Sequence, residues 1–265
     1  MQKCSREGRI IASNYFNYYK AFARSGIVEY HEGPVSWIIP RKGKNGPSLA
    51  FRIHLNEENA ETELKALGRG IQKGEVPKLW IVTPDASPDH IIEIMERSGF
   101  RNLSGEDDEP AMLLRREDFL PYREENSRII CRSVSTMDDF RTWVDVVNTA
   151  LHGWDMIDAD HYFTWVQEEA VRIYLAETDG AVISTCATIQ NGSTASLEFV
   201  STLEQYRRKK AAALLSSFAI ADLLNNGAET VTLSACGDSV HLYRRLGFQK
   251  IFNNTILEYQ FVQEE

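Results

Sequence analysis

The sequence predicts an α/β protein of the α+β type, with a mixed central sheet flanked by helices and a smaller α/β domain before it. Strand and helix patterns follow one another over residues 128–262 in the order β-α-α-β-β-β-α-β-α-β, and shorter patterns alternate in the first third of the chain. The 265 residues, 43% hydrophobic and 25% charged, have the composition of an ordinary globular protein. This length suits one large domain or two small ones.

The first third of the chain contains the elements of a small α/β domain. Aromatic residues recur through a helical stretch at 10–24, and the turn-forming segment 42–47 separates two short strand patterns. The expected elements are a helix at 10–24, strands at 35–39 and 49–55, a helix at 57–72, a strand at 79–82, a helix at 89–98, an acidic loop at 105–110 and a strand at 111–114. We expect this domain to occupy residues 1–122.

Residues 117–126 are charged and contain Pro121, which is typical of a linker. The second domain is expected at residues 128–265. Thr136 is a suitable N-cap for its first helix, because Asp138 and Asp139 follow in the first turn. The expected elements are a strand at 128–133, helices at 137–151 and up to 167, strands at 171–178, 181–189 and 194–202, a helix at 207–226, a strand at 230–234, a helix from 238 and two last strands to 261.

Charge and cysteine content limit the classes of partner. The formal net charge of -9 disfavours nucleic acid and anionic membranes, which require a broad basic surface. The four cysteines lie far apart without metal-ligand spacing, so free thiols in a reducing compartment are expected rather than disulfides or a metal site. There is no apolar run of 18 residues and no signal-peptide core. We therefore expect a cytoplasmic protein.

One segment combines a strand, a basic turn and the start of an apolar helix. The strand at 194–202 is followed by four consecutive cations, Arg207, Arg208, Lys209 and Lys210. A helix N-terminus leaves up to four N–H groups unpaired and carries about +0.5 charge, so it binds anions readily. Cations at that point oppose the helix dipole, which favours a phosphate site over a merely solvated helix start.

This segment resembles motif A of the GNAT acyltransferases, roughly V/T-x-P-x-x-(Q/R)-x-x-G-x-(G/A), on which Thr202, Tyr206, Arg207 and Ala212 fall. Residues 241–248 resemble the L-Y-x-x-L-G-F segment of the same family, at the separation that its fold requires. The resemblance implies the GNAT fold, acetyl-CoA as co-substrate and no metal. The residues that it implies for binding acetyl-CoA are Val200, Ser201, Thr202, Arg207, Arg208, Lys209, Lys210, Ala211 and Ala212.

The resemblance also implies how the strand at 194–202 acts. In the family this strand splays from its neighbour, often at a bulge, so that a main-chain N–H faces the thioester oxygen as an oxyanion hole. One position departs from the pattern, because the family's glycine falls on Lys210. We expect Lys210 in helical φ and ψ, where its ammonium could contact phosphate or crowd the site.

Two side chains are candidates for catalysis. Glu198 lies nine residues before Arg207, where some members that acetylate amines carry glutamate. With a pKa near its ordinary value of about 4.3 it would act through water or by attracting the amine; the alternative is an exposed strand carboxylate. Tyr243 is the candidate acid that protonates the leaving thiolate. Its alternative role is packing under a helix beside Leu242 and Leu246.

The leading hypothesis is an acetyl-CoA-dependent N-acetyltransferase that acts on a primary amine of a small molecule or peptide, as a monomer or homodimer. Residues 152–158 lie where the family shapes its acceptor pocket; there Asp155 and Asp158 suit a cationic amine beside Trp154, or they cap a helix. A second hypothesis, motivated by Lys210, is a non-catalytic acyl-CoA-binding or interaction protein with a decayed site. A larger acyl donor or an aminoacyl-tRNA donor is the third, which the acidic charge disfavours.

The two halves of the chain also share a faint internal echo. Residues 91–100 resemble residues 240–248, and both segments end in Gly-Phe after a helical pattern. The shared ending has two interpretations: a reduced GNAT-like repeat in the first third, or a glycine C-cap with an aromatic that packs back. The first copy has no basic turn and carries Met95 where the second carries Tyr243. If it is a repeat, we expect it to do no chemistry.

Overall fold

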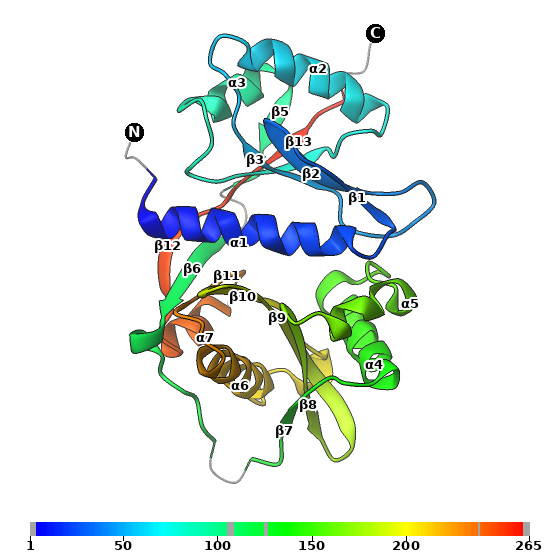
Figure 1. Cartoon of the computed structure of the whole chain (residues 1–265), viewed down its shortest axis with the longest axis vertical. Coiled ribbons are helices and arrows are strands. Elements are labelled where there is room, and N and C mark those ends of the chain that lie inside the picture. The colour runs from blue at the N-terminus through cyan, green and yellow to red at the C-terminus, as the bar shows by residue number, and fades with distance from the viewer. Residues whose placement is uncertain (1–3, 105–108, 125–126, 238, 262–265) are drawn as a thin grey trace. The chain divides into compact units, whose positions relative to one another are not determined.

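The computed structural model describes residues 4–104, 109–124, 127–237 and 239–261 (Figure 1). The chain forms two compact units, Met1–Ala111 with Ile251–Glu265, and Met112–Lys250. Each unit contains a mixed sheet flanked by helices, which confirms the predicted fold class. Most of the acidic loop expected at 105–110 lies outside the described residues.

The first unit is built on a six-stranded sheet. Its order is β1 (Val28–His31), β2 (Val35–Pro40), β3 (Leu49–Ile53), β4 (Leu79–Val82), β13 (Thr255–Tyr259) and β5 (Phe100–Asn102). Strands β3 and β4 run parallel, and the other neighbours run antiparallel. Strand β1 is not expected from the sequence, because Val28 is its single buried side chain and the apolar alternation is too short to recognise.

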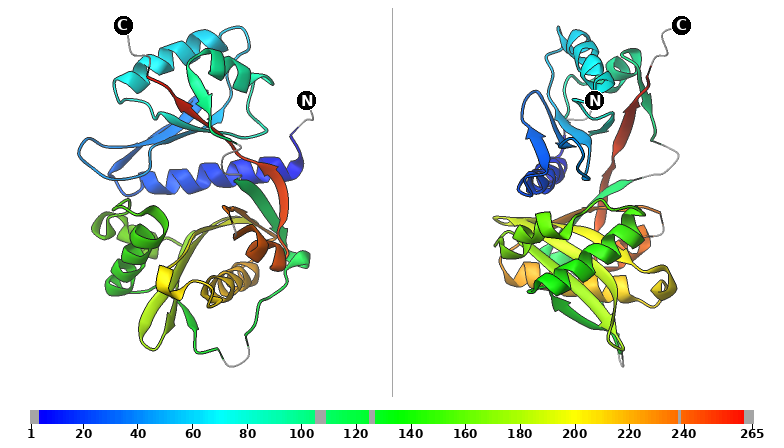
Figure 2. Two further views of the ribbon diagram at one scale, coloured as in Figure 1. Left: turned by 180° about the vertical axis from the view of Figure 1, so that it is seen from behind. Right: turned by 90° about the vertical axis from the view of Figure 1, so that its right-hand side faces the viewer.

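Helices cover both faces of this sheet: α1 (Arg6–Ala23) on one, and α2 (Ala60–Gln72) with α3 (Ile91–Arg97) on the other (Figure 2). Helix α1 begins earlier than expected, because the Ser5 hydroxyl accepts a hydrogen bond from the N–H of Gly8 at 3.0 Å. Successive strand residues face opposite sides. Accordingly Ala50 of β3 lies in the core with α2 and α3, while the ring of Phe51 lies 4.7 Å from that of Tyr19 in α1.

The second unit is built on a seven-stranded sheet. Its order is β12 (Gln249–Asn253), β6 (Pro110–Arg115), β11 (Thr230–Ser234), β10 (Thr194–Thr202), β9 (Ala181–Asn191), β8 (Val171–Thr178) and β7 (Ile130–Ser133). Its helical segments are η1 (Arg116–Asp118), α4 (Met137–Val147), the π-helical turn η2 (Asn148–His152), α5 (Ala159–Tyr162), η3 (Phe163–Gln167), η4 (Glu204–Tyr206), α6 (Ala211–Asn225) and α7 (Ser239–Arg245). Helix α4 covers one face of this sheet and α6 the other (Figure 1).

A backbone irregularity in β10 directs neighbouring side chains into both cores. Leu197 packs with the buried residues of α6, whereas the ring of Phe199 lies 5.2 Å from that of Trp143 in α4. In a regular strand, residues two apart share a face. The bulge at this point, where Phe199 has a φ of 54°, therefore turns the Phe199 ring to the opposite face of the sheet.

The units exchange one strand each along the sequence. β6, expected in the domain at 1–122, lies between β11 and β12 of the second sheet. β13, expected in the domain at 128–265, lies between β4 and β5 of the first sheet. The division by contacts at Ala111 and Lys250 thus differs from a single boundary at 122–128. The linker expected at 117–126 follows β6 instead of preceding the second sheet.

Both units contain helices and strands in the same order. In each, a helix precedes three antiparallel strands, a second helix leads to a strand parallel to the third, and a short third helix follows. The third helix ends in both units at a glycine in the left-handed region, Gly99 with φ 95° and Gly247 with φ 103°. A Cβ atom at Gly247 would lie 2.0 Å from the carbonyl oxygen of Asp118, so only glycine fits.

Candidate active site

The parallel strands β10 and β11 part halfway along their length. Their pairing ends at Ser196 and Thr232. On the other side of β10, the register with β9 shifts between Glu198 and Ser201, at the bulge. Such an opening leaves main-chain N–H and C=O groups of one strand edge without ladder partners. It is therefore a place where a ligand can hydrogen-bond to the backbone.

Side-chain hydroxyls hold the last part of β10 on β9. The hydroxyl of Ser184 donates to the carbonyl of Ser201 at 2.6 Å and lies 2.9 Å from the hydroxyl of Thr202. Val200, which precedes these two residues and is also expected to contact the co-substrate, is partly buried against the core on the α6 side of the sheet. The edge of this segment that faces β11 is left unpaired by the ladder.

The basic turn stands between η4 and α6. The sequence predicts that residues 207–210 form the first turn of this helix. In the structure, α6 begins at Ala211, so these residues precede it. The guanidinium of Arg207 donates to the carbonyls of Thr202 at 3.3 Å and Ala150 at 3.5 Å. Arg207 thereby ties the end of β10 to the turn η2, and all four cations are exposed. An anion at this helix start would meet both free N–H groups and cationic side chains.

Lys210 departs from the helical φ and ψ expected for it. It has a φ of 68°, in the left-handed region, and Arg208 has a φ of 63°. The position thus keeps a glycine-like backbone while carrying a lysine, which costs about 1 kcal/mol. The ammonium of Lys210 binds both carboxylate oxygens of Glu124, at 2.7 and 2.9 Å. Lys209 lies 4.9 Å from the ring centre of Tyr206.

The pKa of Glu198 differs from the ordinary carboxylate value expected at this position. It lies in the part of β10 beyond the pairing with β11 and is partly buried. Burial raises the pKa of Glu198 to about 8, and the nearby Ser196 hydroxyl offsets only part of this shift. Because burial disfavours the charged form, the carboxyl is mostly protonated at pH 7. A carboxyl group with this pKa can exchange a proton near neutral pH.

Tyr243 lies in α7, 5% exposed, with its ring 5.8 Å from that of Phe248. Burial raises the pKa of Tyr243 far above its ordinary value, and the thiols of Cys186 and Cys236 and the carboxyl of Glu198 add to the effect. The phenol therefore stays protonated at neutral pH and is able to donate a proton or a hydrogen bond.

The turn η2 contributes a side chain that sequence reasoning did not select. The ring of His152 lies edge-on to Phe199 of the bulge, 6.4 Å between centres. Its Nε2 atom is buried, and none of the described residues hydrogen-bonds to it. Burial lowers the pKa of His152, so the imidazole is neutral at pH 7. The sequence places His152 in the expected acceptor loop, but its position beside the bulge depends on the π-helical turn.

The rest of the acceptor loop is largely exposed. Asp158 accepts a hydrogen bond from the N–H of Asp160 at 3.0 Å and lies 3.0 Å from Nδ1 of His161, so it caps α5, as one of the two expected alternatives stated. Trp154 is 48% exposed. Asp155 is exposed next to it. Trp154 and Asp155 are thus accessible and suited to attract a cation, whereas the exposed Asp158 is engaged in the cap.

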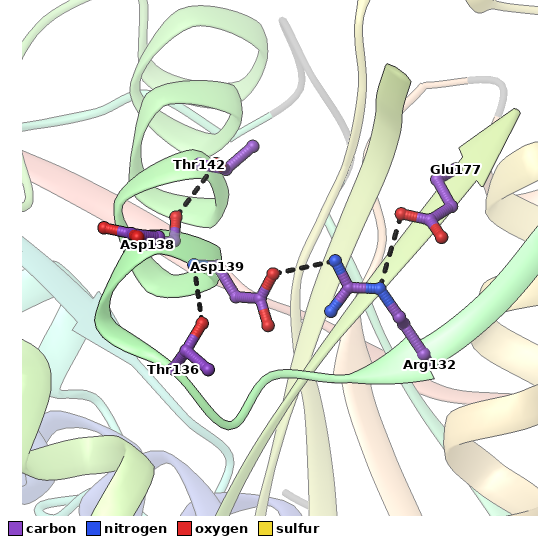
Figure 3. A network of polar contacts seen from close by, with 6 residues as sticks. All are labelled: Arg132, Thr136, Asp138, Asp139, Thr142 and Glu177. Carbon is purple, nitrogen blue, oxygen red and sulfur yellow. Dashed lines mark hydrogen bonds and ion pairs between the residues drawn. The ribbon is translucent and has the colours of Figure 1, made fainter. Parts of the chain in front are cut away.

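A polar network holds the start of α4 on the sheet (Figure 3). Arg132 of β7 donates to Asp139 at 2.7 Å and to Glu177 of β8 at 3.3 Å. Thr136 caps the helix by accepting from the N–H of Asp139 at 3.1 Å, which confirms the expected N-cap. The network positions the helix whose continuation, η2, carries His152.

We expect Arg132→Ala to lower the free energy of unfolding by about 1 kcal/mol at pH 7, because the pairs are partly exposed. Arg132 lowers the pKa of Asp139, so this contribution is present above the ordinary pKa of an aspartate and is lost as the pH falls below about 4. Urea unfolding at pH 7 and at pH 3.5 measures both effects. Arg101→Ala, at a weaker ion pair of 3.9 Å, is the matched control; equal losses in both variants at pH 7 would contradict the prediction.

Neither a metal cluster nor a membrane-spanning helix occurs among the described residues. No group of three His, Cys, Asp or Glu side chains within that part of the chain could hold a metal ion. No helix in the same residues is long and apolar enough to cross a membrane.

Part of the second unit matches a known family model. Residues 137–248 match the model of the Acetyltransferase (GNAT) family. The chain also matches solved structures over most of its length. A GCN5-related N-acetyltransferase from Kribbella flavida has a TM-score of 0.70 at 17% identity, covering 94% of this chain and 96% of that one. One from Sphaerobacter thermophilus has 0.63 at 17%, covering 84% and 79%.

A tandem GNAT protein from the clavulanic acid biosynthesis pathway has a TM-score of 0.60 at 12% identity, covering 92% of this chain and 94% of that one. Because the matches extend over both units, the first unit has a GNAT-like fold too, and the tandem arrangement accounts for the internal echo at residues 91–100. At these identities the likeness concerns the fold. No curated protein matches the sequence.

Proposed function

We propose that the protein is an acetyl-CoA-dependent N-acetyltransferase acting on a primary amine of a small molecule or peptide, on the premise that residues 137–248, which match the GNAT family model, form an acetyltransferase domain. One observation carries the proposal. The opening between β10 and β11 leads directly into the basic turn at residues 207–210 and the N-terminus of α6. Backbone groups for an acyl-pantetheine arm and N–H groups for a pyrophosphate are thereby joined in one continuous segment.

The proposed chemistry assigns one task to each group. The amine nitrogen forms a bond to the thioester carbonyl carbon, and the carbon–sulfur bond breaks. Glu198, in its ionised form, accepts a proton from the ammonium directly or through water; a pKa of about 8 makes it far better matched to this task than an ordinary carboxylate. Tyr243 donates a proton to the departing thiolate and regains one from the attacking nitrogen, which releases its second proton as the amide forms. Backbone N–H groups of residues 200–202 stabilise the oxyanion.

Binding of the co-substrate is proposed to rest on the basic turn. Arg207 and Arg208 and the unpaired N–H groups at Ala211 and Ala212 would hold the pyrophosphate. Lys210 is engaged with Glu124, so we assign it a smaller share. The proposed acceptor side is the loop at 152–158, and the protein would act in the cytoplasm as a monomer or homodimer without nucleic-acid or membrane partners.

Titration calorimetry with acetyl-CoA, followed by thiol release with a panel of primary amines, tests the proposal. We expect micromolar binding that weakens about tenfold or more in the variant Arg207→Ala/Arg208→Ala, because two charge-assisted phosphate contacts are lost. Arg69→Ala/Arg97→Ala, which removes two exposed cations of the first unit, should bind acetyl-CoA as the wild type does.

The alternative of a non-catalytic acyl-CoA-binding protein is favoured by one observation, the strained lysine at the glycine position. Tight binding without thiol release from any amine would support that alternative. Absence of binding in the wild type would contradict both, unless Lys210→Gly restores it, which would identify the lysine side chain as the obstacle.

A further inference from the structure

The first unit contains a cavity of about 350 Å³ that the proposed reaction does not use. It lies between α1, β3 and the segment after β4. The side chains of chemical interest in its lining are three aromatic rings and three charged groups: Tyr15, Phe16, Phe51, Arg9, Arg52 and Asp85. This volume is at the lower end of the range for small-molecule sites, about 300–1,000 Å³.

The cavity exists because β3 and β4 separate and then rejoin. They pair at Ala50 and Trp80, and again at His54 and Ser87. The segment on the β4 side is three residues longer between these points. It forms a turn in which the carbonyl of Thr83 accepts a hydrogen bond from the N–H of Ala86 at 3.0 Å. Arg52, which lines the cavity, has a φ of 53°. A non-glycine residue in this region is strained, which is typical of functional positions.

The corresponding opening in the second unit is where we place the acyl-CoA, but the first unit is unsuited to it. Its strands close again at His54 and Ser87, where a pantetheine arm would have to pass. Its second helix, α2, begins among four carboxylates instead of four cations: Glu57, Glu58, Glu61 and Glu63. Carboxylates at this helix start would repel a pyrophosphate. The cavity is therefore a site of another kind.

Charges of both signs line the cavity. The Oδ1 atom of Asp85 is buried, and no described residue donates a hydrogen bond to it, while Oδ2 lies 3.8 Å from Nε2 of His54. Arg9 donates one hydrogen bond, to the carbonyl of Cys4 at 2.7 Å, and Arg52 lies 3.6 Å from Glu32. Since a guanidinium has five N–H donors in a fork that matches a carboxylate, both arginines keep donors for a ligand.

Aromatic rings also line the cavity. The rings of Phe16 and Phe51 both line the cavity, and the guanidinium of Arg52 lies 5.0 Å from the ring centre of Phe16. This contact holds the arginine against the aromatic wall. A ligand that satisfies all three features carries an anionic group, a cationic group and an apolar part.

We propose that this cavity of the first unit binds a free α-amino acid with an apolar or aromatic side chain. Arg9 and Arg52 bind its carboxylate, Asp85 accepts hydrogen bonds from its ammonium, and Phe16 and Phe51 contact its side chain. The unit binds this ligand without transforming it.

Titration calorimetry of the full chain with L-phenylalanine and L-leucine tests the proposal. We expect one bound molecule per chain. N-acetyl-L-phenylalanine, which lacks the ammonium, and L-phenylalaninamide, which lacks the carboxylate, should each bind about tenfold or more weakly, because one charge-assisted contact with the cavity is lost. Asp85→Asn should weaken binding of L-phenylalanine by a similar factor. Asp89→Asn, an exposed aspartate outside this cavity, and Tyr243→Phe in the second unit should bind as the wild type does.

Three results would overturn the proposal: no binding of either amino acid at millimolar concentration, N-acetyl-L-phenylalanine binding as tightly as L-phenylalanine, or full binding by Asp85→Asn. If Asp85→Asn does not fold, as judged by its melting curve, Arg9→Gln decides, since Arg9 is exposed on α1. A loss of about tenfold or more in Arg9→Gln supports the site, and unchanged affinity rejects it.

Discussion

Glu198→Gln is expected to lower kcat for acetyl transfer about a hundredfold or more while leaving the Kd for acetyl-CoA unchanged. Glutamine has the same shape as glutamate but cannot take a proton from the ammonium. Single-turnover thiol release at saturating acetyl-CoA measures the effect. The control is Glu204→Gln, which makes the same change at an exposed position in η4 and should leave kcat as it is. Equal turnover of both variants would remove Glu198 from the reaction.

The pH dependence follows from the same group. Because the pKa of Glu198 is raised to about 8, kcat/KM of the wild type should rise with pH and level off above this value, and Glu198→Gln should lose that limb. Folding stability changes in the opposite sense. The folded state retains a proton that the unfolded chain releases near pH 4.5, so the free energy of unfolding falls as the pH rises from there through about 8. The difference in the free energy of unfolding between Glu198→Gln and the wild type should therefore shift in favour of the variant between pH 5 and pH 9.

Tyr243→Phe is expected to lower kcat about tenfold to a hundredfold with unchanged affinity for acetyl-CoA. The buried ring keeps its contact with Phe248, so the fold is retained and only the hydroxyl that protonates the thiolate is lost. Thiol release under saturating conditions and calorimetric titration separate the two quantities. Tyr30→Phe in the first unit removes a tyrosine hydroxyl far from the proposed site in sequence and serves as the matched control. Full activity of Tyr243→Phe would assign this residue to packing alone.

Much of the second unit could be predicted from the sequence because its signals are local. Thr136 followed by Asp138 and Asp139 identifies the start of α4, and the strand at 194–202 has the bounds of β10. Capping, hydrophobic periodicity and glycine stops act over a few residues, so they can be recognised without knowing what packs against them. The Gly-Phe endings at 99–100 and 247–248 were recognised for the same reason.

The strand exchange could not be predicted in this way. The sequences of β6 and β13 each have the hydrophobic pattern of a strand, but this pattern does not determine which strand each one pairs with. Each lies in the sheet of the other half of the chain, where it fills the place beside a parallel strand, β11 or β4. Pairing between segments far apart in sequence is decided by which sheet edge and core remain open when the units form, a property of the whole fold.

The sequence by itself determined the fold class, the family resemblance and the place where a basic turn follows a strand. Only the tertiary structure decided three things: the left-handed backbone at Arg208 and Lys210, the raised pKa of Glu198, and the cavity beside Asp85. Residue type indicates neither a positive φ in a lysine nor the burial of a particular carboxyl. Both arise when distant segments pack together, because backbone strain is sustained, and a charge loses its water, only where the surrounding structure enforces it.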